Sequence, residues 1–310
     1  MKKTLTLSML MVVFSIFQLQ SQIPRVVAGR ILRIEHFKSN FVSARNIDIW
    51  LPPDYTPARK YPVLYMHDGQ MLYDAETTWN KQEWGVDETI SRLIEEKKIP
   101  PVIVVGIWNS GYGRHADYFP RKPFEGMQDW EKELVVRESK NHARRFLSSP
   151  IQSDNYLKFI VKELKPFIDK HYATLRDRAN TFIAGSSMGG LISMYAVCEY
   201  PKVFGGAACL STHWPGVADI RNNPLPDAFC RYLGKQLPAP KHHRFYFDYG
   251  TETLDALYEP YQHKVDSVFM AKKYTAKHWD TLKFEGKDHS ENAWRERLEI
   301  PLLFLFGKKK

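Results

Sequence analysis

The chain has 310 residues, of which 44% are hydrophobic and 25% charged, and its formal net charge is +9 at pH 7. This length is enough for one large domain with a substantial core. Apart from three lysines at 308–310 the basic residues are dispersed, so the charge favours attraction to acidic substrates and argues against nucleic-acid binding. The odd count of three cysteines excludes a full disulfide framework, and no C-x-x-C pair supports a thiol redox role.

The N-terminus predicts a secretory signal peptide at residues 1–21. Lys2 and Lys3 precede an apolar run at 5–19, and a polar patch follows with a cleavage point after Ser21. The alternative interpretation is a membrane anchor, but this run is shorter than the roughly 20 residues that span a bilayer. No later stretch is long and apolar enough to cross a membrane. We therefore expect a secreted or periplasmic protein without stable membrane insertion, carrying a charge of +7 after cleavage.

Eight strands are expected after residue 28, and helical patterns separate most of them. The continuous apolar runs of the middle strands are typical of a parallel sheet buried on both faces. A short turn joins the first two strands, which predicts an antiparallel edge. The expected strands cover residues 30–37, 41–51, 61–66, 101–107, 182–185, 206–210, 244–249 and 279–284.

Helices are expected at 86–97, 156–172, 190–198, 260–274 and 291–305. In the second of these, apolar residues recur with helical spacing, and Pro166 removes one backbone hydrogen bond and predicts a kink. Alternating strands and helices predict a doubly wound α/β sheet in a single domain over residues 28–306. Residues 111–153 hold no strand signal. We expect them to form a cap or rim over the active site, with a solvent-exposed insertion as the alternative.

The run G-S-S-M-G at 185–189 fits the nucleophile pattern G-x-S-x-G. A short apolar strand precedes it and an apolar helix follows, as a nucleophile elbow requires. Glycines leave room beside the serine in such a strained turn. Ser187 would then present its hydroxyl at a helix N-terminus, where developing negative charge is stabilised. The alternative is a glycine-rich turn that only ends a strand.

A serine needs a base, and on this fold the order along the chain is serine, acid, histidine. Of eleven histidines, only His289 follows the eighth strand, just before the last helix. The acid should follow the seventh strand, where Asp255 and Glu252 are both available. Asp255 is preferred and Glu252 is the alternative, and a Ser-His dyad without a strict acid partner stays open.

The oxyanion hole is expected to use the Met188 amide and a second amide from the loop after the third strand, that of Gln70 or Gly69. Arg114 in the 111–153 segment and His213 with Trp214 after the sixth strand are candidates for substrate binding. Trp214 would stack on a sugar or an aromatic acyl group, with core packing as its alternative. No ligand spacing for a metal and no nucleotide-binding motif occurs, so no metal or cofactor is expected.

These motifs resemble the esterase D/feruloyl esterase family of α/β-hydrolases, which includes acetylxylan esterases, ferric enterobactin esterases and mycolyltransferases. The resemblance rests on the runs at 64–70, 185–190 and 286–289 and covers roughly residues 28–306. It implies Ser187 as nucleophile, His289 as base and a carboxylate of the 249–255 loop as acid. Relatives often carry this acid two or three residues after the glycine of that loop, whereas Asp255 lies five after Gly250.

Together these features predict a secreted serine carboxylesterase that acts on a small-molecule or carbohydrate ester, such as an acetyl or feruloyl ester. Two alternatives remain. The same triad also serves a peptidase, a thioesterase or an acyltransferase, and the fold also occurs as a catalytically inactive binding protein.

Overall fold

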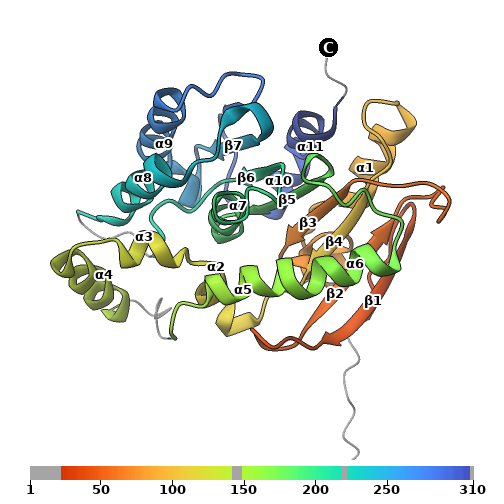
Figure 1. Cartoon of the computed structure of the whole chain (residues 1–310), viewed down its shortest axis with the longest axis horizontal. Helices are drawn as coiled ribbons and strands as arrows, with labels where there is room; N and C mark the ends of the chain where they lie inside the picture. The colour runs from red at the N-terminus through yellow and green to blue at the C-terminus, as the bar shows by residue number, and fades with distance from the viewer. Residues whose placement is uncertain (1–21, 142–148, 218–221, 308–310) are drawn as a thin grey trace, which may run out of the picture.

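The computed structural model describes residues 22–141, 149–217 and 222–307 (Figure 1). The predicted signal peptide at 1–21 lies outside the described residues, as do 142–148 of the predicted insertion and the lysines at 308–310.

A single eight-stranded sheet forms the centre of the fold, and all eight predicted strands belong to it. The strand order is β1-β2-β4-β3-β5-β6-β7-β8. β2 pairs antiparallel with both β1 and β4, and the strands from β4 to β8 run parallel, so the predicted antiparallel edge is confirmed. The strands are β1 (Arg30–Phe37), β2 (Arg45–Leu51), β3 (Val63–His67), β4 (Ile103–Ile107), β5 (Thr181–Ser186), β6 (Gly206–Leu210), β7 (Arg244–Gly250) and β8 (Trp279–Phe284).

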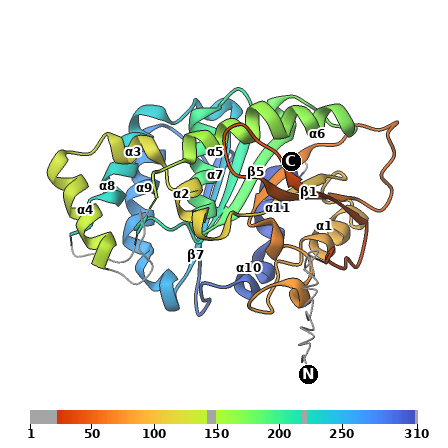
Figure 2. The ribbon, with the colours of Figure 1, turned by 90° about the horizontal axis from the view of Figure 1, so that it is seen from below.

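Helices cover both faces of the sheet, which explains why its middle strands are apolar throughout. Side chains alternate between the faces, so on β3 Val63 and Tyr65 enter one core while Leu64 and Met66 enter the other. Figure 2 shows the two layers of helices on opposite sides of the sheet. The first core packs against α5 (Ser153–Phe159), α6 (Lys165–His171), α7 (Met188–Glu199), α8 (Leu225–Gln236) and α9 (Glu259–Ala271), and the second against α1 (Val86–Glu95), α10 (Glu291–Arg297) and α11 (Glu299–Phe306).

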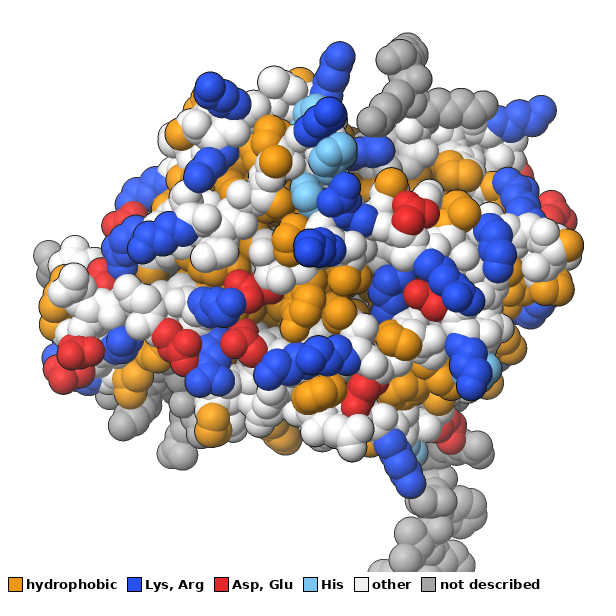
Figure 3. All heavy atoms as spheres, viewed as in Figure 1, with side chains coloured by type: hydrophobic (Ala, Val, Ile, Leu, Met, Phe, Trp, Pro, Cys, Tyr) orange, Lys and Arg blue, Asp and Glu red, His pale blue; other side chains and the backbone are white. Residues whose placement is uncertain are grey.

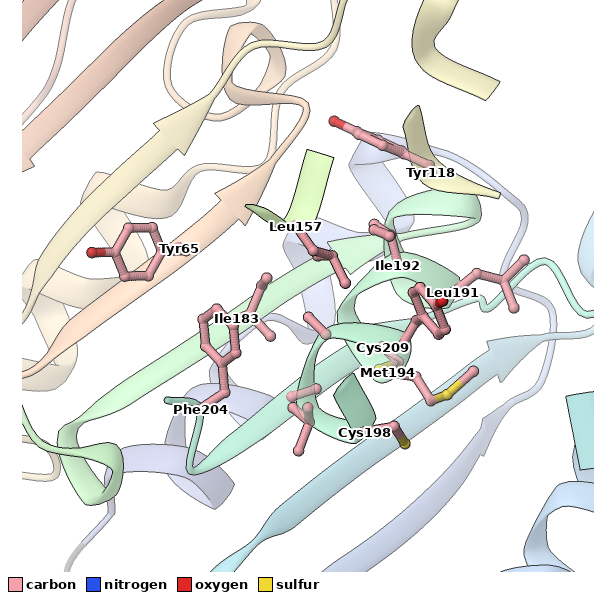
Figure 4. Packing of buried hydrophobic residues seen from close by; sticks show 14 of the residues in the cluster. Tyr65, Tyr118, Leu157, Ile183, Leu191, Ile192, Met194, Cys198, Phe204 and Cys209 are labelled. Atoms are coloured by element: carbon pink, nitrogen blue, oxygen red, sulfur yellow. The ribbon is translucent and has the colours of Figure 1, made fainter. Parts of the chain in front are cut away.

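Helix α7 is the most deeply buried helix of the first core. Eleven of its residues are buried, and Leu191, Ile192 and Met194 pack among side chains of the sheet (Figure 4). Its Cys198 and the β6 residue Cys209 are buried free thiols, and Cys230 is also free. Burying large apolar side chains contributes on the order of 2 kcal/mol each, so this packing fixes the position of the helix that follows Ser187.

Two predicted helices are interrupted. The helix expected at 156–172 begins at Ser153, passes through a π-helical turn at Ile160–Leu164 and continues as α6, with Pro166 in the first turn of α6. Because proline cannot donate to a carbonyl in the preceding turn, the wider turn accommodates it. The helix expected at 291–305 divides at Leu298 into α10 and α11. Helix α8 was not predicted.

The described parts of the 111–153 segment, residues 111–141 and 149–153, are largely helical and pack into the fold. They contain α2 (Arg114–Tyr118), α3 (Arg121–Glu125) and α4 (Asp129–Asn141). Tyr118 and Phe119 are fully buried, and Glu131 of α4 forms a salt bridge with Arg231 of α8 at 3.0 Å. The helices α3 and α4 therefore belong to the layer around α8, and the alternative of a solvent-exposed insertion does not describe them.

The surface shows dispersed charge. On the face in Figure 3, lysine and arginine side chains are spread between acidic and apolar ones. Over residues 22–141, 149–217 and 222–307, no helix combines the length and apolar character needed to cross a membrane.

Candidate active site

Ser187 lies at the sharp turn between β5 and α7. Its φ of 57° and ψ of −122° are strained for a residue with a side chain. The turn closes tightly, since a Cβ on Gly185 would lie 2.9 Å from the carbonyl carbon of Gly189. The hydroxyl is thus held at the N-terminus of α7, where the first amides of the helix have no acceptor within the helix.

His289 contacts one of the two carboxylates that the sequence left open. Its Nδ1 lies 2.5 Å from Asp255 Oδ1. Asp255 belongs to the 3-10 turn Thr253–Leu257 after β7 and is 1% exposed, whereas the Glu252 side chain is exposed to solvent. The geometry therefore places Asp255, and not Glu252, where it can orient the imidazole.

Backbone hydrogen bonds tie the loop that carries His289 to the loop that carries Asp255. The amides of Thr251 and Glu252 donate to the Lys287 carbonyl at 2.9 and 3.0 Å, and the His289 amide donates to Thr253 Oγ1 at 3.0 Å. The two loops approach closely at Gly250, where a Cβ would lie 2.0 Å from the Lys287 oxygen. Only glycine fits there.

The Asp255 carboxylate is fully hydrogen-bonded. Its Oδ2 accepts from the Gly250 amide at 2.6 Å and from the Ser211 hydroxyl at 2.5 Å. Ser211 Oγ in turn accepts from Trp294 Nε1 at 2.9 Å and from Arg297 at 2.8 Å. An indole N–H and a guanidinium only donate, so the Ser211 proton must point to Asp255. These hydrogen bonds fix the orientation of the carboxylate towards the imidazole.

Ser187 and His289 line one open cleft of about 540 Å³. In the part of the chain that the structure describes, no hydrogen bond joins the Ser187 hydroxyl to the imidazole. Contacts of this kind are often long in an enzyme without substrate and tighten when substrate binds.

The loop after β3 packs against the start of α7. A Cβ on Gly189 would lie 3.4 Å from both the His67 side chain and Asp68 Oδ2. Gly69 fits tightly against β4, because a Cβ there would lie 2.6 Å from the Gly106 carbonyl carbon. Gln70 follows in this loop and lines the cleft together with Ser187. The segments expected to supply the oxyanion donors are therefore neighbours.

Arg114 also lines the cleft, so the 111–153 segment does contribute to its rim. Its guanidinium binds Asp68 in bidentate fashion at 2.7 and 2.8 Å, and Asn109 donates to the same carboxylate at 2.7 Å. His67 is the last residue of β3, and its Nδ1 lies 2.8 Å from the Tyr156 hydroxyl. Burial lowers the pKa of His67 to about 3, so its imidazole is neutral at pH 7.

The other two predicted substrate contacts lie away from the cleft. The ring of Trp214 is 1% exposed, packs against Phe229 and Phe247, and donates its N–H to Gln262 at 2.8 Å. His213 is 6% exposed and bonds the Tyr258 hydroxyl. The turn after β6 carries both side chains under the surface, which corrects the expectation that they face the substrate.

Several cleft residues were not predicted. Trp79 is the most exposed of them, at 84%, and it follows β3 in a loop without a recognisable motif. The sequence alone does not show that Trp79 is exposed, because a large apolar side chain in a loop is equally compatible with core packing. The other unpredicted lining residues include Asn80, Gln82, Trp84, Asn109, Leu254, Glu291 and Trp294.

The sheet order, the strained serine turn and the histidine after the last strand together define an α/β-hydrolase fold. A family model described as "Putative esterase" matches residues 39–304, and the chain belongs to this family. Among solved structures, a ferulic acid esterase is similar with a TM-score of 0.65 and 17% identity, over 90% of this chain and 98% of the other. The enterobactin esterase FES from Shigella flexneri gives a TM-score of 0.63 at 17% identity, over 91% and 60%.

The matches to curated relatives cover a smaller share of this chain than the matches to solved structures do. The uncharacterized protein YbbA of Bacillus subtilis is 25% identical over 172 residues, which are 55% of this chain and 58% of YbbA. The endo-1,4-beta-xylanase/feruloyl esterase of Xylanibacter ruminicola is 27% identical over 59% of this chain and 22% of its own length. This chain thus spans little more than half of the first relative and under a quarter of the second.

Proposed function

We propose that this protein is an exported serine carboxylesterase that forms an acyl-enzyme on Ser187. The observation that carries the proposal is the placement of a His289–Asp255 pair and a strained serine turn on one cleft. The basic and apolar segment at 1–21 supports export through a signal peptide.

In this reaction His289 takes the proton of the Ser187 hydroxyl while Oγ attacks the ester carbonyl carbon. The tetrahedral oxyanion accepts hydrogen bonds from the Met188 amide and from that of Gln70 or Gly69. His289 then protonates the alkoxide, the alcohol leaves, and the acyl group stays on Ser187. A water molecule, deprotonated by His289, attacks the acyl carbon and releases the acid and the free serine hydroxyl.

The lining of the cleft favours an ester with a polar alcohol part. Polar side chains such as Asn80, Gln82 and Asn109 line the cleft together with tryptophans, so it offers both hydrogen-bonding groups and aromatic faces, which a sugar can use. Asp68 neutralises Arg114, so the cleft does not select strongly for an anion. We therefore propose a carbohydrate-linked acetyl or feruloyl ester as substrate, a choice that the names of the relatives also suggest.

A fluorophosphonate probe tests the nucleophile. It should label the full-length protein at one residue, and Ser187→Ala should abolish labelling and lower ester hydrolysis by at least about a thousandfold. The matched control is Ser110→Ala, which changes a serine outside the cleft lining and should react as wild type. Folded wild type that is not labelled would instead indicate a binding protein of this fold.

A substrate panel then separates the remaining chemistries. Acetylated xylan, methyl ferulate, a siderophore lactone and nitrophenyl esters should be hydrolysed in preference to peptides and thioesters. Faster turnover of a peptide or a thioester would replace the carboxylesterase assignment, and transfer of the acyl group to an added alcohol would indicate an acyltransferase.

A further inference from the structure

Two buried charged residues near the His289–Asp255 pair take no part in the reaction above. Asp248 of β7 is fully buried, and Arg297 of α10 is 3% exposed. The Nη2 of Arg297 donates to Asp248 Oδ1 at 2.9 Å. Burial raises the pKa of Asp248, and the guanidinium opposes this rise. Because an unpaired charge is costly to bury, each of the two groups depends on the other.

The guanidinium lies close to the Asp255 carboxylate without bonding to it. Nη2 is 3.9 Å from Asp255 Oδ2, and the Ser211 hydroxyl bridges these two atoms. It accepts from Nη2 at 2.8 Å and donates to Oδ2 at 2.5 Å. Nη2 has two protons, of which one goes to Asp248 and the other to Ser211. None is left on this nitrogen for Asp255, whose other oxygen contacts His289.

The charges of this cluster leave one negative charge beside the imidazole. Two carboxylates, Asp248 and Asp255, surround one guanidinium, so the formal charge is −1, as it would be for Asp255 alone. Negative charge next to His289 stabilises its imidazolium and positive charge destabilises it. Without Asp248 the charge of Arg297, 3.9 Å from Asp255, would cancel that of the catalytic carboxylate.

We propose that Asp248 is a positioning residue that holds and neutralises Arg297, so that the charge of Asp255 is left to stabilise the imidazolium of His289. This inference rests on Ser187 as the nucleophile and His289 as its base. It gives a role to a second buried carboxylate beside a triad that needs only one. The other ionisable groups around the imidazole, which the test leaves unchanged, are the Tyr258 phenol, His213 bonded to that phenol, Asp68, Arg114 and Glu291 on the cleft, and the neighbouring Asp288.

The test is the second-order rate at which a fluorophosphonate labels full-length Asp248→Asn, measured across the pH range. Labelling forms the Oγ–P bond, expels fluoride and passes the serine proton to His289. Asparagine keeps an oxygen for Arg297 but not the charge, so the guanidinium is no longer compensated. Labelling should become about tenfold slower at its plateau. The acid side of the profile should move about one unit to lower pH, because both changes report the same weakening of the imidazolium.

The double variant Asp248→Asn with Arg297→Met separates this effect from damage to the core. It removes both charges and again leaves −1 on Asp255, so the plateau and the acid side should return to within about twofold of wild type. A merely structural role predicts that the second core substitution adds to the loss. Asp48→Asn is the matched control, because buried Asp48 pairs with Arg33 at 2.7 Å on β2, which four strands separate from β7. It should label with the wild-type rate and profile.

If Asp248→Asn does not fold, the double variant and Arg297→Gln carry the test. Arg297→Gln leaves two carboxylates without a cation and should move the acid side to higher pH. An acid side that does not move in the folded single variants, or a double variant that labels no faster than Asp248→Asn, overturns the role of Asp248 while wild type still labels. Wild type that does not label at all overturns the proposed nucleophile and this inference with it.

Discussion

At the scale of single residues, the two acidic side chains after β7 differ in what they touch. Asp255 is buried against His289, the Gly250 amide and Ser211, whereas Glu252 is exposed. Asp255→Asn should lower kcat/KM for a nitrophenyl ester by about a thousandfold or more, because an amide neither holds the imidazole tautomer nor stabilises its charge. Glu252→Gln is the matched control and should stay within twofold of wild type. Equal activity of both variants would mean that His289 works as a dyad with Ser187.

Trp79 offers a residue-scale test of the proposed carbohydrate substrate. It is 84% exposed on the cleft, so it can stack on a sugar or an aryl ring at little cost to the fold. Trp79→Ala should lower kcat/KM for a polysaccharide ester about three- to tenfold, since such stacking contributes roughly 1 kcal/mol. Hydrolysis of nitrophenyl acetate should not change. Trp130→Ala removes another exposed tryptophan, on α4, and serves as control. An equal loss on both esters would show that Trp79 acts on the serine turn instead.

The sequence predicts candidate residues where a local pattern or a position in the strand order marks them. Ser187 follows from the glycines around it, and His289 from its place after the last strand. Ser211 and Tyr258 carry no such mark. Their partners, Trp294 and His213 respectively, are 83 and 45 residues away, and only the folded chain shows which buried hydroxyl meets which acceptor. For the same reason the sequence left two interpretations of Trp214 open, substrate stacking and core packing, and the structure shows core packing.

At the scale of elements, periodicity located the strands well and the helix boundaries less well. Each buried strand is short and apolar, and its length distinguishes it from a buried helix, which needs about ten residues or more. The helix at 156–172 appeared continuous because the apolar spacing persists through the π-helical turn. Helix α8 is not among the predicted helices, although Leu225, Ala228, Phe229, Tyr232 and Leu233 repeat at helical spacing and are all buried. The prolines at 224 and 226 lie at its start, where proline is tolerated.

The contact between the N-terminal segment and α1 gives a prediction for stability. Asp87 of α1 is fully buried and accepts the Val27 amide at 2.6 Å. Burial, assisted by the nearby Glu88, raises the pKa of Asp87 to about 7. Because an aspartate in the unfolded chain has a pKa near 3.9, the folded state binds this proton more tightly. The contribution of Asp87 is therefore fully favourable below about pH 4 and is lost as the pH rises through 7.

Asp87→Asn removes the charge and keeps an oxygen for Val27. It should increase the free energy of unfolding at pH 8 by on the order of 2 kcal/mol and leave it nearly unchanged at pH 4, as measured by urea denaturation at both values. The control is Asp74→Asn, because Asp74 accepts the Arg25 amide at 2.9 Å in the same segment but is partly exposed. A variant Asp87→Asn that is less stable than wild type at pH 8 would show that the carboxylate is needed in its charged form.

At the scale of the whole molecule, alternating strands and helices were enough to predict one doubly wound sheet. The crossing of β3 and β4 in the strand order leaves no local signal, because it depends on where each connection returns to the sheet. The packing of the described part of the 111–153 segment also leaves no local signal, because it depends on which helices that part meets in the folded chain. Among the described residues of this segment, Arg114 lines the cleft, whereas α3 and α4 join the layer around α8, where Glu131 binds Arg231.

The hydrogen bonds between the two loops at 249–255 and 284–289 hold His289 and Asp255 in a fixed relative position. Lys287 and Thr253 make these bonds, whereas Ser187 lies between the inner strand β5 and helix α7. β8 is the outermost strand of its edge. The Asp255 carboxylate also accepts from Ser211, which follows β6, and the Ser187 amide donates to Leu210 at the end of that strand. The imidazole and the carboxylate are therefore tied to the strand that borders the serine turn, so the pair is held in place beside it before any substrate arrives.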